Sequence, residues 1–315
     1  MLTSSNHPYG NAARKSAISA SDIAFITANY NTLQCIEQLV LFFGGLNAPF
    51  PFSFTVVDNN SFDGSREFLQ SCSGINYLQT GENLGYGRAI NRGVAATTSK
   101  YICVLNSDVV LNRDALIQLW RFLEEHPEAG VAAPRITYAD GREQGMVFKP
   151  LLFSHYVEWF AKLVAWSQKW KAVHASAPFH VDGVMGAFFL IRRSLVPQPT
   201  LFDEDFFFFY EDSALAHTLK NRGVPCYVLP DLSIIHIGGQ SRSPGSISFF
   251  FEGRYLYLQK FYGAFHAKAV YFFDRFRTLR KWFLYSLLLL FTSSSRIKSK
   301  QRHYQLVWSN VSPKW

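Results

Sequence analysis

Two adjacent carboxylates, Glu211 and Asp212, follow the aromatic run 206–210 and stand at the start of a predicted helix. A carboxylate beside apolar rings loses part of its hydration, which raises its pKa toward the range in which a general base works near neutral pH. Carboxylates are also common in the first turn of any helix, because the unpaired N–H groups there favour negative charge. These residues alone leave both interpretations open.

Polar residues also follow two predicted strands, 54–57 and 101–105. Asp58 closes the first strand, where its carboxylate could accept a hydrogen bond from the N3–H of uracil or thymine; with Asn59-Asn60-Ser61 it also fits an Asx turn. Asn106-Ser107-Asp108 follows the second strand and offers amide and carboxylate oxygens to a hard divalent cation, which would also bind diphosphate oxygens. A single Asp after a strand is more often a turn or helix cap, so the cation site is a hypothesis.

Two glycine-containing stretches could approach phosphate groups. Gly85 and Gly87 precede a predicted helix, whose backbone N–H groups could face a phosphate with Arg88 adding charge. Their spacing matches neither G-x-G-x-x-G nor the P-loop, which argues against a nicotinamide oxidoreductase and a P-loop NTPase. His236 lies beside Gly238-Gly239, which permits close approach of a phosphate, although such a histidine is more often a structural residue.

The elements that must position these residues alternate between strands and helices across residues 21–130. Strands are predicted at 23–27, 54–57, 75–78 and 101–105, with a helix after each, and this order indicates a parallel sheet with right-handed crossovers. Such sheets bind ligands at the carboxyl ends of their strands. Further on, the pattern predicts a helix at 112–125, an insertion on the acceptor side at 134–180, and short strands at 184–191 and 227–229.

Composition narrows the class of protein. The chain has 315 residues, of which 48% are hydrophobic and 17% charged, so it is long enough for one large α/β domain with an appendage. A formal charge of +8 predicts anionic partners. The basic residues cluster near an apolar tail and form no stripe among base-stacking positions, so nucleic acid is not expected. Four scattered cysteines predict a reducing compartment, the polar N-terminus predicts no signal peptide, and residues 1–20 are expected to be disordered.

Taken in order, these stretches resemble the inverting family-two glycosyltransferases of the GT-A fold, in particular the rhamnosyltransferase-like branch of bacterial polysaccharide synthesis. The resemblance covers about residues 22–262 and rests on the ordered set of motifs at 26–31, 57–65, 83–91, 105–108, 186–193, 202–212 and 236–239. It implies an α/β fold with a mostly parallel central sheet flanked by helices. The nucleotide half would span 21–110 and the acceptor half 111–262.

The resemblance also implies a role for individual residues. The implied donor-binding residues are Thr27, Asn29, Asp58, Asn83, Gly85, Arg88, Asn91, Asn106, Ser107 and Asp108. Asp108 and His236 would hold Mg²⁺ or Mn²⁺, and Asp212 would be the catalytic base beside Glu211. The acceptor would meet Gly186, Ala187 and Asp182. The chain departs from many relatives at Asn106, where they carry the first Asp of Asp-x-Asp, and at 182–185, where they often place a Trp.

The expected reaction moves a sugar from dTDP-rhamnose or a UDP-sugar to a glycan or a polyprenyl-diphosphate-linked acceptor. The alternative is a non-catalytic, membrane-associated sugar-nucleotide-binding protein. The presence of Asp108, Asp212 and His236 argues against it, because a protein without turnover has no need to retain these residues.

Residues 263–315 are expected to form a basic, amphipathic helical region. Its apolar run 282–291 is shorter than the roughly 20 residues of a membrane span. With cations on both sides it predicts an interfacial helix on an anionic membrane, unless the run docks on the catalytic domain or on a second copy. The expected location is the cytoplasmic face of the cell membrane.

Overall fold

The computed structural model describes residues 22–144, 156, 163, 166–167, 174–196, 200–239 and 246–310. The lead-in expected at 1–20 and most of the insertion expected at 134–180 lie outside these residues.

The first half of the chain forms the predicted parallel sheet. Its strands are β1 (Ile23–Asn29), β2 (Phe52–Asp58), β3 (Asn76–Gln79) and β4 (Tyr101–Leu105), in the spatial order β3-β2-β1-β4. The crossovers contain α1 (Leu33–Gly44), α2 (Ser65–Ser71) and α3 (Tyr86–Ala95). Because β1 pairs with β2 in a register that sets Asn29 opposite Asp58, the polar ends of these strands meet at one edge of the sheet.

The second half extends the same sheet in the order β8-β6-β9-β5 beyond β4. It contains β5 (Val109–Val110), α4 (Arg113–Glu125), β6 (Val131–Thr137), β7 (Phe179–Val181), β8 (Phe188–Arg192), the 3-10 turn η1 (Arg193–Leu195), α7 (Glu211–Asn221) and β9 (Cys226–His236). β6 pairs parallel with β9, whereas β8, β5 and β7 run antiparallel to their neighbours. The central sheet is therefore parallel through its nucleotide half and mixed beyond it.

β6 is a strand that the sequence pattern did not predict. Its sequence contains two alanines and Pro134, which are weak strand formers, and the register with β9 shifts between Pro134 and Arg135. The long partner β9 was predicted only as the fragment 227–229, because Pro230 and Asp231 interrupt its apolar run. Pairing between the two strands supplies what the local propensities lack.

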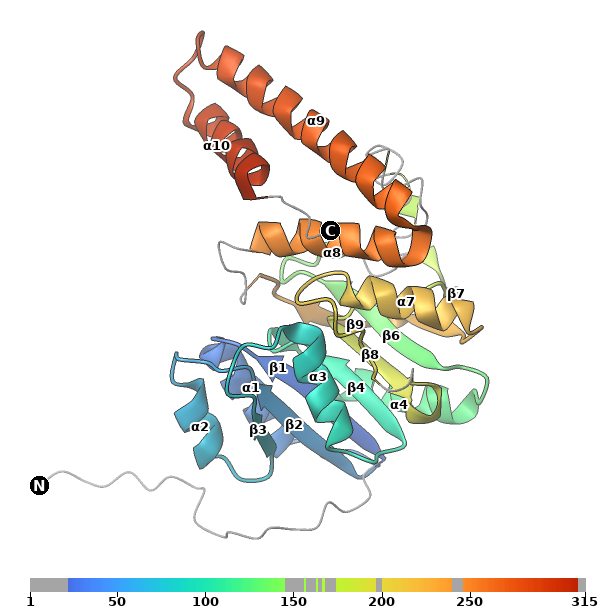
Figure 1. The fold of residues 1–315 in the computed structure, drawn as a ribbon. Coiled ribbons are helices and arrows are strands. Elements are labelled where there is room, and N and C mark those ends of the chain that lie inside the picture. The colour runs from blue at the N-terminus through green and yellow to red at the C-terminus, as the bar shows by residue number, and fades with distance from the viewer. Residues whose placement is uncertain are drawn as a thin grey trace, which may run out of the picture.

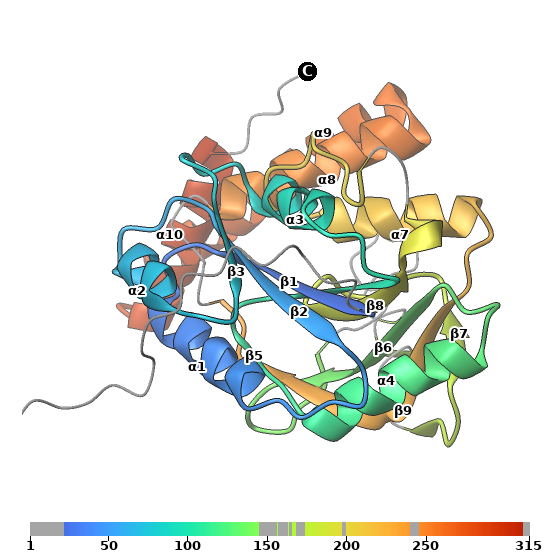
Figure 2. The same ribbon diagram turned by 90° about the horizontal axis from the view of Figure 1, so that it is seen from below.

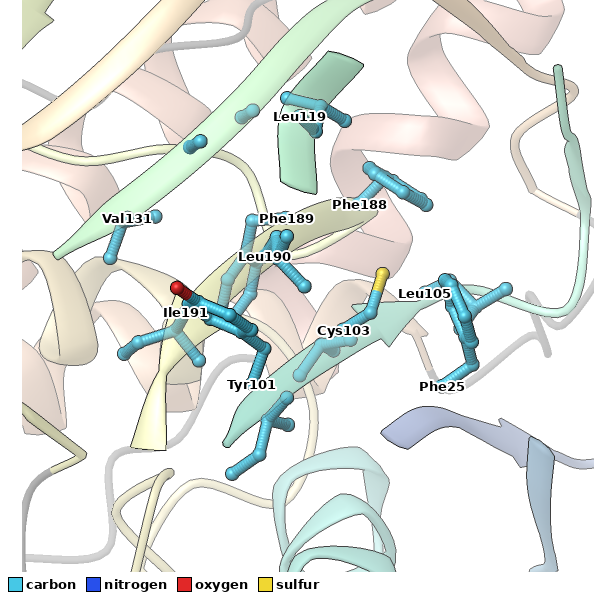
Figure 3. Packing of buried hydrophobic residues seen from close by; sticks show 14 of the residues in the cluster. Phe25, Tyr101, Cys103, Leu105, Leu119, Val131, Phe188, Phe189, Leu190 and Ile191 are labelled. Atoms are coloured by element: carbon cyan, nitrogen blue, oxygen red, sulfur yellow. The ribbon is translucent and has the colours of Figure 1, made fainter. Parts of the chain in front are cut away.

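The core lies on both faces of the sheet. Figure 3 shows side chains from β4 and β8 packed together, among them Tyr101, Cys103 and Phe188, which are 1% exposed or less. All five residues of β4 are buried, as expected for a strand covered on both sides. Figure 2 shows α3 and α7 along one face and α1 and α4 along the other.

Three helices follow the sheet: α8 (Ser246–Tyr262), α9 (Ala264–Leu288) and α10 (Ser295–Asn310). In Figure 1, α9 and α10 lie side by side beyond α8, on the side away from the nucleotide half. A second apolar cluster joins this region to the sheet domain; its buried members are Phe206, Ala214, Tyr255, Tyr257, Leu258, Ala267, Val270 and Val307. Within it, Arg254 of α8 and Asp274 of α9 form a buried ion pair at 2.8 Å. No helix in the described ranges has the length and hydropathy of a membrane span.

Replacing Gly93 of α3 by Ala should destabilise the nucleotide half. A Cβ atom there would stand 2.4 Å from Ile26 Cγ2 and 3.2 Å from Val57 Cγ2, so helix and sheet would have to separate. Overpacking of this kind costs about 1–3 kcal/mol, which urea unfolding would measure. The control is Gly44→Ala at the end of α1, where no atom lies within 4 Å of the added carbon. Equal midpoints for the two variants would contradict the close packing of α3.

Candidate active site

A buried polar network holds the carboxyl ends of β1, β2 and the segment after β4 together. Asn29 Nδ2 donates to Asp58 Oδ1 at 3.1 Å and to Ser61 Oγ at 3.0 Å. Thr32 Oγ1 is 2.7 Å from Asn29 Oδ1 and 2.9 Å from Ser107 Oγ. All five residues are buried. The predicted donor-binding positions Asn29, Asp58 and Ser107 are therefore brought together, and the network keeps the loops above the sheet in one arrangement.

The side chain of Asp58 bonds back to its own loop, but to a backbone N–H three residues on, whereas an Asx turn bonds two residues on. The Asp58 side chain is buried, and both carboxylate oxygens lie within 3.4 Å of the backbone N of Ser61. Its role in reading a nucleotide base stays a prediction. Thr27, which is also buried, has no hydrogen-bond partner for Oγ1 among the residues that the structure describes.

Two adjoining cavities lie along this edge of the sheet. The first, of 80 Å³, is lined by Ala28, Tyr30, Asn59, Asn83, Gly85, Tyr86, Phe207, Phe208, Ser246 and Phe249. The second, of 120 Å³, is lined by Ala28, Tyr86, Asn106, Ser107, Asp108, Phe208, Phe209, His236 and Gly239. They share Ala28, Tyr86 and Phe208, so they adjoin, and the two cavities together are called the trough; its lining extends from residues after β2 to the end of β9.

The glycine loop before α3 seats the aromatic run 206–210. At Gly85, whose φ is +84°, an added Cβ would stand 2.2 Å from the carbonyl oxygen of Phe207. Tyr86 N donates to that same oxygen at 2.9 Å, and Gly85 N donates to Asn83 Oδ1 at 3.0 Å. These two N–H groups are thus paired within the protein. A contact between this loop and phosphate stays a prediction.

Arg88 and Asn91 fasten the segment that precedes the aromatic run. Arg88 Nε donates to the Glu204 carbonyl at 2.8 Å. The Asn91 amide bonds to both backbone groups of Phe202, at 2.8 and 2.9 Å. The structure therefore uses both predicted donor-binding residues to position 202–204, and their contact with a nucleotide remains a prediction.

Asp108 and His236 meet at the end of the second cavity. β5 pairs with β9 so that Val109 stands opposite His236, which brings Asp108 Oδ1 to 3.2 Å from His236 Nε2. Asp108 Oδ2 accepts from Gly238 N at 3.0 Å, and Asn106 Nδ2 lies 3.2 Å from the same imidazole nitrogen. Carboxylate and imidazole therefore present two ligand atoms to one place.

These two residues fit a divalent cation that is shared with a substrate. No three His, Cys, Asp or Glu side chains cluster around a metal position within the described ranges. Mg²⁺ is usually held by one or two carboxylates together with substrate phosphates, and the open volume beside Asp108 and His236 leaves room for the latter. Ligand atoms about 3.2 Å apart can both reach an ion at roughly 2.0–2.2 Å.

Glu211 and Asp212 begin α7 and have different surroundings. Asp212 Oδ2 accepts from Gly186 N at 3.2 Å and Oδ1 accepts from Ser213 N at 2.7 Å, whereas Glu211 Oε2 has no hydrogen-bond partner among the described residues. Burial, with Asp212 alongside, raises the pKa of Glu211 to about 8. Burial raises the pKa of Asp212 as well, but its hydrogen bonds oppose that shift. The negative charge of the pair therefore belongs to Asp212.

The predicted acceptor residues separate into two places. Gly186 and Ala187 lie beside the site, since Gly186 N bonds to Asp212 and the Ala187 carbonyl accepts from Asn106 N at 2.9 Å. Asp182 instead pairs with Lys220 at 3.1 Å, near the far end of α7. Eight residues of helix separate Lys220 from Asp212, which is about 12 Å along the axis. The structure does not bring Asp182 to the base.

Three residues of the site had no predicted role of their own, although Phe208 belongs to the aromatic run 206–210 that the sequence did single out. Tyr86 and Phe208 line both cavities, and the Tyr86 hydroxyl donates to the Gly186 carbonyl at 3.0 Å. Gln144 Oε1 lies 2.8 Å from His236 Nδ1. Tyr86 stands within the glycine loop, which was a usable signal. Gln144 had none, because its contact joins residues 92 positions apart.

Residues 25–198 match the model of the family described as glycosyl transferase family 2. The chain belongs to this family. An N-acetylglucosaminyl-diphospho-decaprenol L-rhamnosyltransferase of Mycobacterium tuberculosis H37Rv is 26% identical over 288 residues, which cover 82% of this chain and 89% of the relative. A low-salt glycan biosynthesis hexosyltransferase of Haloferax volcanii is 24% identical over 229 residues, covering 69% and 67%.

The fold of this glycosyltransferase chain is also the fold of solved GT-A structures. The mannosyltransferase PcManGT from Pyrobaculum calidifontis, determined with GDP-Man and Mn²⁺, superposes with a TM-score of 0.52 and 14% identity. The match covers 92% of this chain and 86% of the mannosyltransferase. The fold expected from the family-two resemblance is confirmed.

The raised pKa of Glu211 predicts a pH-dependent stability. Between pH 4.5 and about 8 the folded chain keeps a proton that the unfolded chain releases, so stability falls as pH rises through this window. Glu211→Gln removes the titrating group, and urea unfolding should show it more stable than wild type by on the order of 2 kcal/mol at pH 9, with a smaller difference at pH 5. Exposed Glu82→Gln is the control. A difference that is the same at both pH values would contradict a neutral, buried Glu211.

Proposed function

We propose that the chain is an inverting, metal-dependent glycosyltransferase of bacterial cell-surface polysaccharide synthesis. The donor would be dTDP-rhamnose or a UDP-sugar, and the acceptor a glycan or a lipid-linked saccharide. The observation that carries the proposal is the Gly186-Ala187 backbone, which bonds to Asp212 on one side and to Asn106 on the other. A candidate base and a candidate diphosphate site thus lie on two sides of one short segment.

The donor would lie along the trough, with its nucleotide in the cavity at the end of β2 and its diphosphate in the cavity at the end of β9. Asp108 and His236 would hold Mg²⁺ or Mn²⁺ there, with the diphosphate oxygens completing the coordination. When bound, the cation neutralises the charge that develops on the departing nucleoside diphosphate. The aromatic side chain of Phe208, which borders both cavities, would exclude water from this region.

Asp212 would accept the proton of the acceptor hydroxyl. The hydroxyl oxygen forms a bond to the anomeric carbon as the bond from that carbon to the diphosphate oxygen breaks, and the proton goes to Asp212. A single displacement with one base inverts the anomeric configuration. Glu211 is buried next to the base in the sequence, and its neutral carboxyl would spare Asp212 the repulsion of a second charge.

Two of the similar proteins support the choice of substrates. The mycobacterial relative is named for a rhamnosyl transfer to a decaprenol-linked saccharide, and the mannosyltransferase structure contains a sugar nucleotide with Mn²⁺. A prenyl-linked acceptor lies at a membrane, so the enzyme would need a membrane-binding surface. The C-terminal helices are the candidate for that surface.

The exposed face of α9 suits a membrane surface. Seven exposed apolar side chains of α9 and the turn after it recur every three, four or seven residues: Phe265, Phe272, Phe276, Leu279, Phe283, Leu287 and Leu290. Phe273, Leu284 and Leu288 of α9 are exposed as well. The spacing of the seven keeps them on one side of the helix. The sequence pattern found only the segment 282–291, whereas the described face begins 17 residues earlier, at Phe265.

The charge of the chain is concentrated in the same region. Residues 264–310 contain nine Lys and Arg residues and one acidic residue, Asp274, which amounts to a net +8. The whole chain also has +8, so the rest of it is balanced. Each basic residue near an anionic leaflet contributes roughly 1 kcal/mol to binding. This charge favours anionic lipid over a second, equally basic copy as the partner of the α9 face.

Asp212→Asn should reduce transfer by about 10²–10⁴-fold while donor affinity changes little, because a positioned general base is lost without disturbing the nucleotide cavity. Transfer would be measured with Mn²⁺ and a panel of nucleotide sugars, and donor affinity by calorimetry. The control is Asp205→Asn, since Asp205 is exposed and pairs with Lys260 on α8. If Asp205→Asn is inactive and Asp212→Asn is not, the base is misassigned. A wild-type chain that binds sugar nucleotides and transfers nothing would favour the non-catalytic alternative.

Replacing Phe272, Phe276 and Phe283 together by Ser should release the chain from anionic vesicles. Each Phe contributes on the order of 1.5–3 kcal/mol when burial is complete, so the three together would contribute about 4.5–9 kcal/mol and vesicle binding at low salt should fall by roughly 10³-fold or more. Deleting the tail is a poorer test, because Ala267, Val270 and Val307 are buried against α8. Phe62→Ser, on the exposed loop after β2, is the control. Wild-type protein that stays in the supernatant would overturn the membrane proposal.

A further inference from the structure

Gln144 is a buried amide that reaches the end of β9 from a tight turn after β6. Thr137 and Glu143 form an antiparallel bridge, and Gln144 N donates to the Ile136 carbonyl at 2.8 Å. Arg135 pairs with Glu143 at 2.9 Å across the base of this turn. The turn thereby sets the side chain of Gln144, which is 5% exposed, against His236.

The surrounding backbone decides the orientation of this amide. Gln144 Nε2 faces two carbonyl oxygens, those of His236 and Thr137. Carbonyl oxygens only accept hydrogen bonds, so the NH₂ group must lie on their side. Oε1 is then the atom that stands 2.8 Å from His236 Nδ1.

This orientation selects one tautomer of His236. An amide oxygen only accepts, so the proton of the neutral imidazole is on Nδ1 and the lone pair is on Nε2. Nε2 is the nitrogen that faces the trough, 3.2 Å from Asp108 Oδ1 and 3.2 Å from Asn106 Nδ2. Lone pairs of Nε2 and of the Asp108 carboxylate then face each other, and a cation between the two atoms would turn this repulsion into attraction.

We propose that Gln144 is a positioning residue that holds His236 in its Nδ1-protonated tautomer and so prepares Nε2 to bind the divalent cation of the donor diphosphate. This rests on the proposed function. Histidines that bind metals usually donate their other N–H to a fixed acceptor, and losing such an acceptor typically costs about 10–100-fold in metal affinity. In this chain the acceptor is an amide whose own NH₂ is tied to the backbone of the same histidine.

A purely structural role for Gln144 would have a different signature. The residue also ties the turn after β6 to the end of β9, so its loss could lower stability without changing the imidazole. The tautomer and the metal affinity are readouts that such a role would not move. Gln144→Glu separates the two further, because a carboxylate keeps an acceptor for Nδ1–H. It replaces the NH₂ donor by a second acceptor and a negative charge, so it disturbs the link to the backbone while retaining the tautomer.

The experiment compares Gln144→Met, Gln144→Glu and the control Gln118→Met, an exposed glutamine on α4, in the full-length chain. ¹⁵N-histidine spectra at alkaline pH would report the tautomer of His236, assigned from a His236→Asn spectrum. Mn²⁺ binding in the presence of UDP would be followed by the electron paramagnetic resonance of the free ion, with Asp108→Ala as the reference for a lost site.

We expect Gln144→Met to mix the two tautomers of His236 and to weaken Mn²⁺ binding by about 10–100-fold. Gln144→Glu and Gln118→Met should retain the wild-type tautomer and bind Mn²⁺ within a few-fold of wild type. The proposal is overturned if Gln144→Met keeps the tautomer, or binds Mn²⁺ as tightly as the control. If even the wild-type chain does not bind Mn²⁺, the metal part of the proposed function fails, and the metal role of Gln144 fails with it.

Discussion

The buried amide of Asn29 is the interaction on which the candidate site depends. It joins the end of β1 to Asp58, the last residue of β2, to Ser61 in the following loop and, through Thr32, to Ser107 after β4. A buried polar group left without its hydrogen-bond partner costs about 1–3 kcal/mol. Each residue of this network must therefore keep its partners, which favours a single arrangement of the three loops. The two cavities of the trough lie beside this network, which fixes the loops that form their walls.

The aromatic run 206–210 is held between two glycines and presents the base at its end. The carbonyl of Phe207 lies against Gly85 on one side, and on the other an added Cβ at Gly253 of α8 would stand 2.8 Å from the carbonyl of Phe209. Phe209 and Tyr210 take φ values of 68° and 70°, a left-handed conformation that costs of order 1–3 kcal/mol per residue. Contacts with both α3 and α8 offset this strain. α8 therefore helps to place Asp212, although its sequence has none of the polar motifs.

Much of the fold followed from local patterns. Buried strands separated by helices predicted β1 to β4 as strands of one parallel sheet, and β4 has the predicted bounds. β6 was missed because Pro134 and its neighbouring alanines have low strand propensity, and only the long partner β9 makes them a strand. The apolar run 282–291 was recognised, but the exposed face of α9 from Phe265 onward could be seen only once the α8 and α10 contacts had covered the other side of that helix.

The sequence by itself determined which chemical groups stand at the ends of the strands, because an apolar run followed by polar residues is a local signal. Asn29, Asp58, Asn106 and Asp108 are positioned by their own strands, and these meet at one edge in any parallel sheet of this order. Only the tertiary structure decided which carboxylate of the Glu211-Asp212 pair is charged, since burial and the bond from Gly186 come from distant segments. The tertiary structure also showed that Asp182 pairs with Lys220 and not with the base, and that Gln144 contacts His236. Local sequence patterns contain no signal for such contacts, because the paired residues are far apart in the chain.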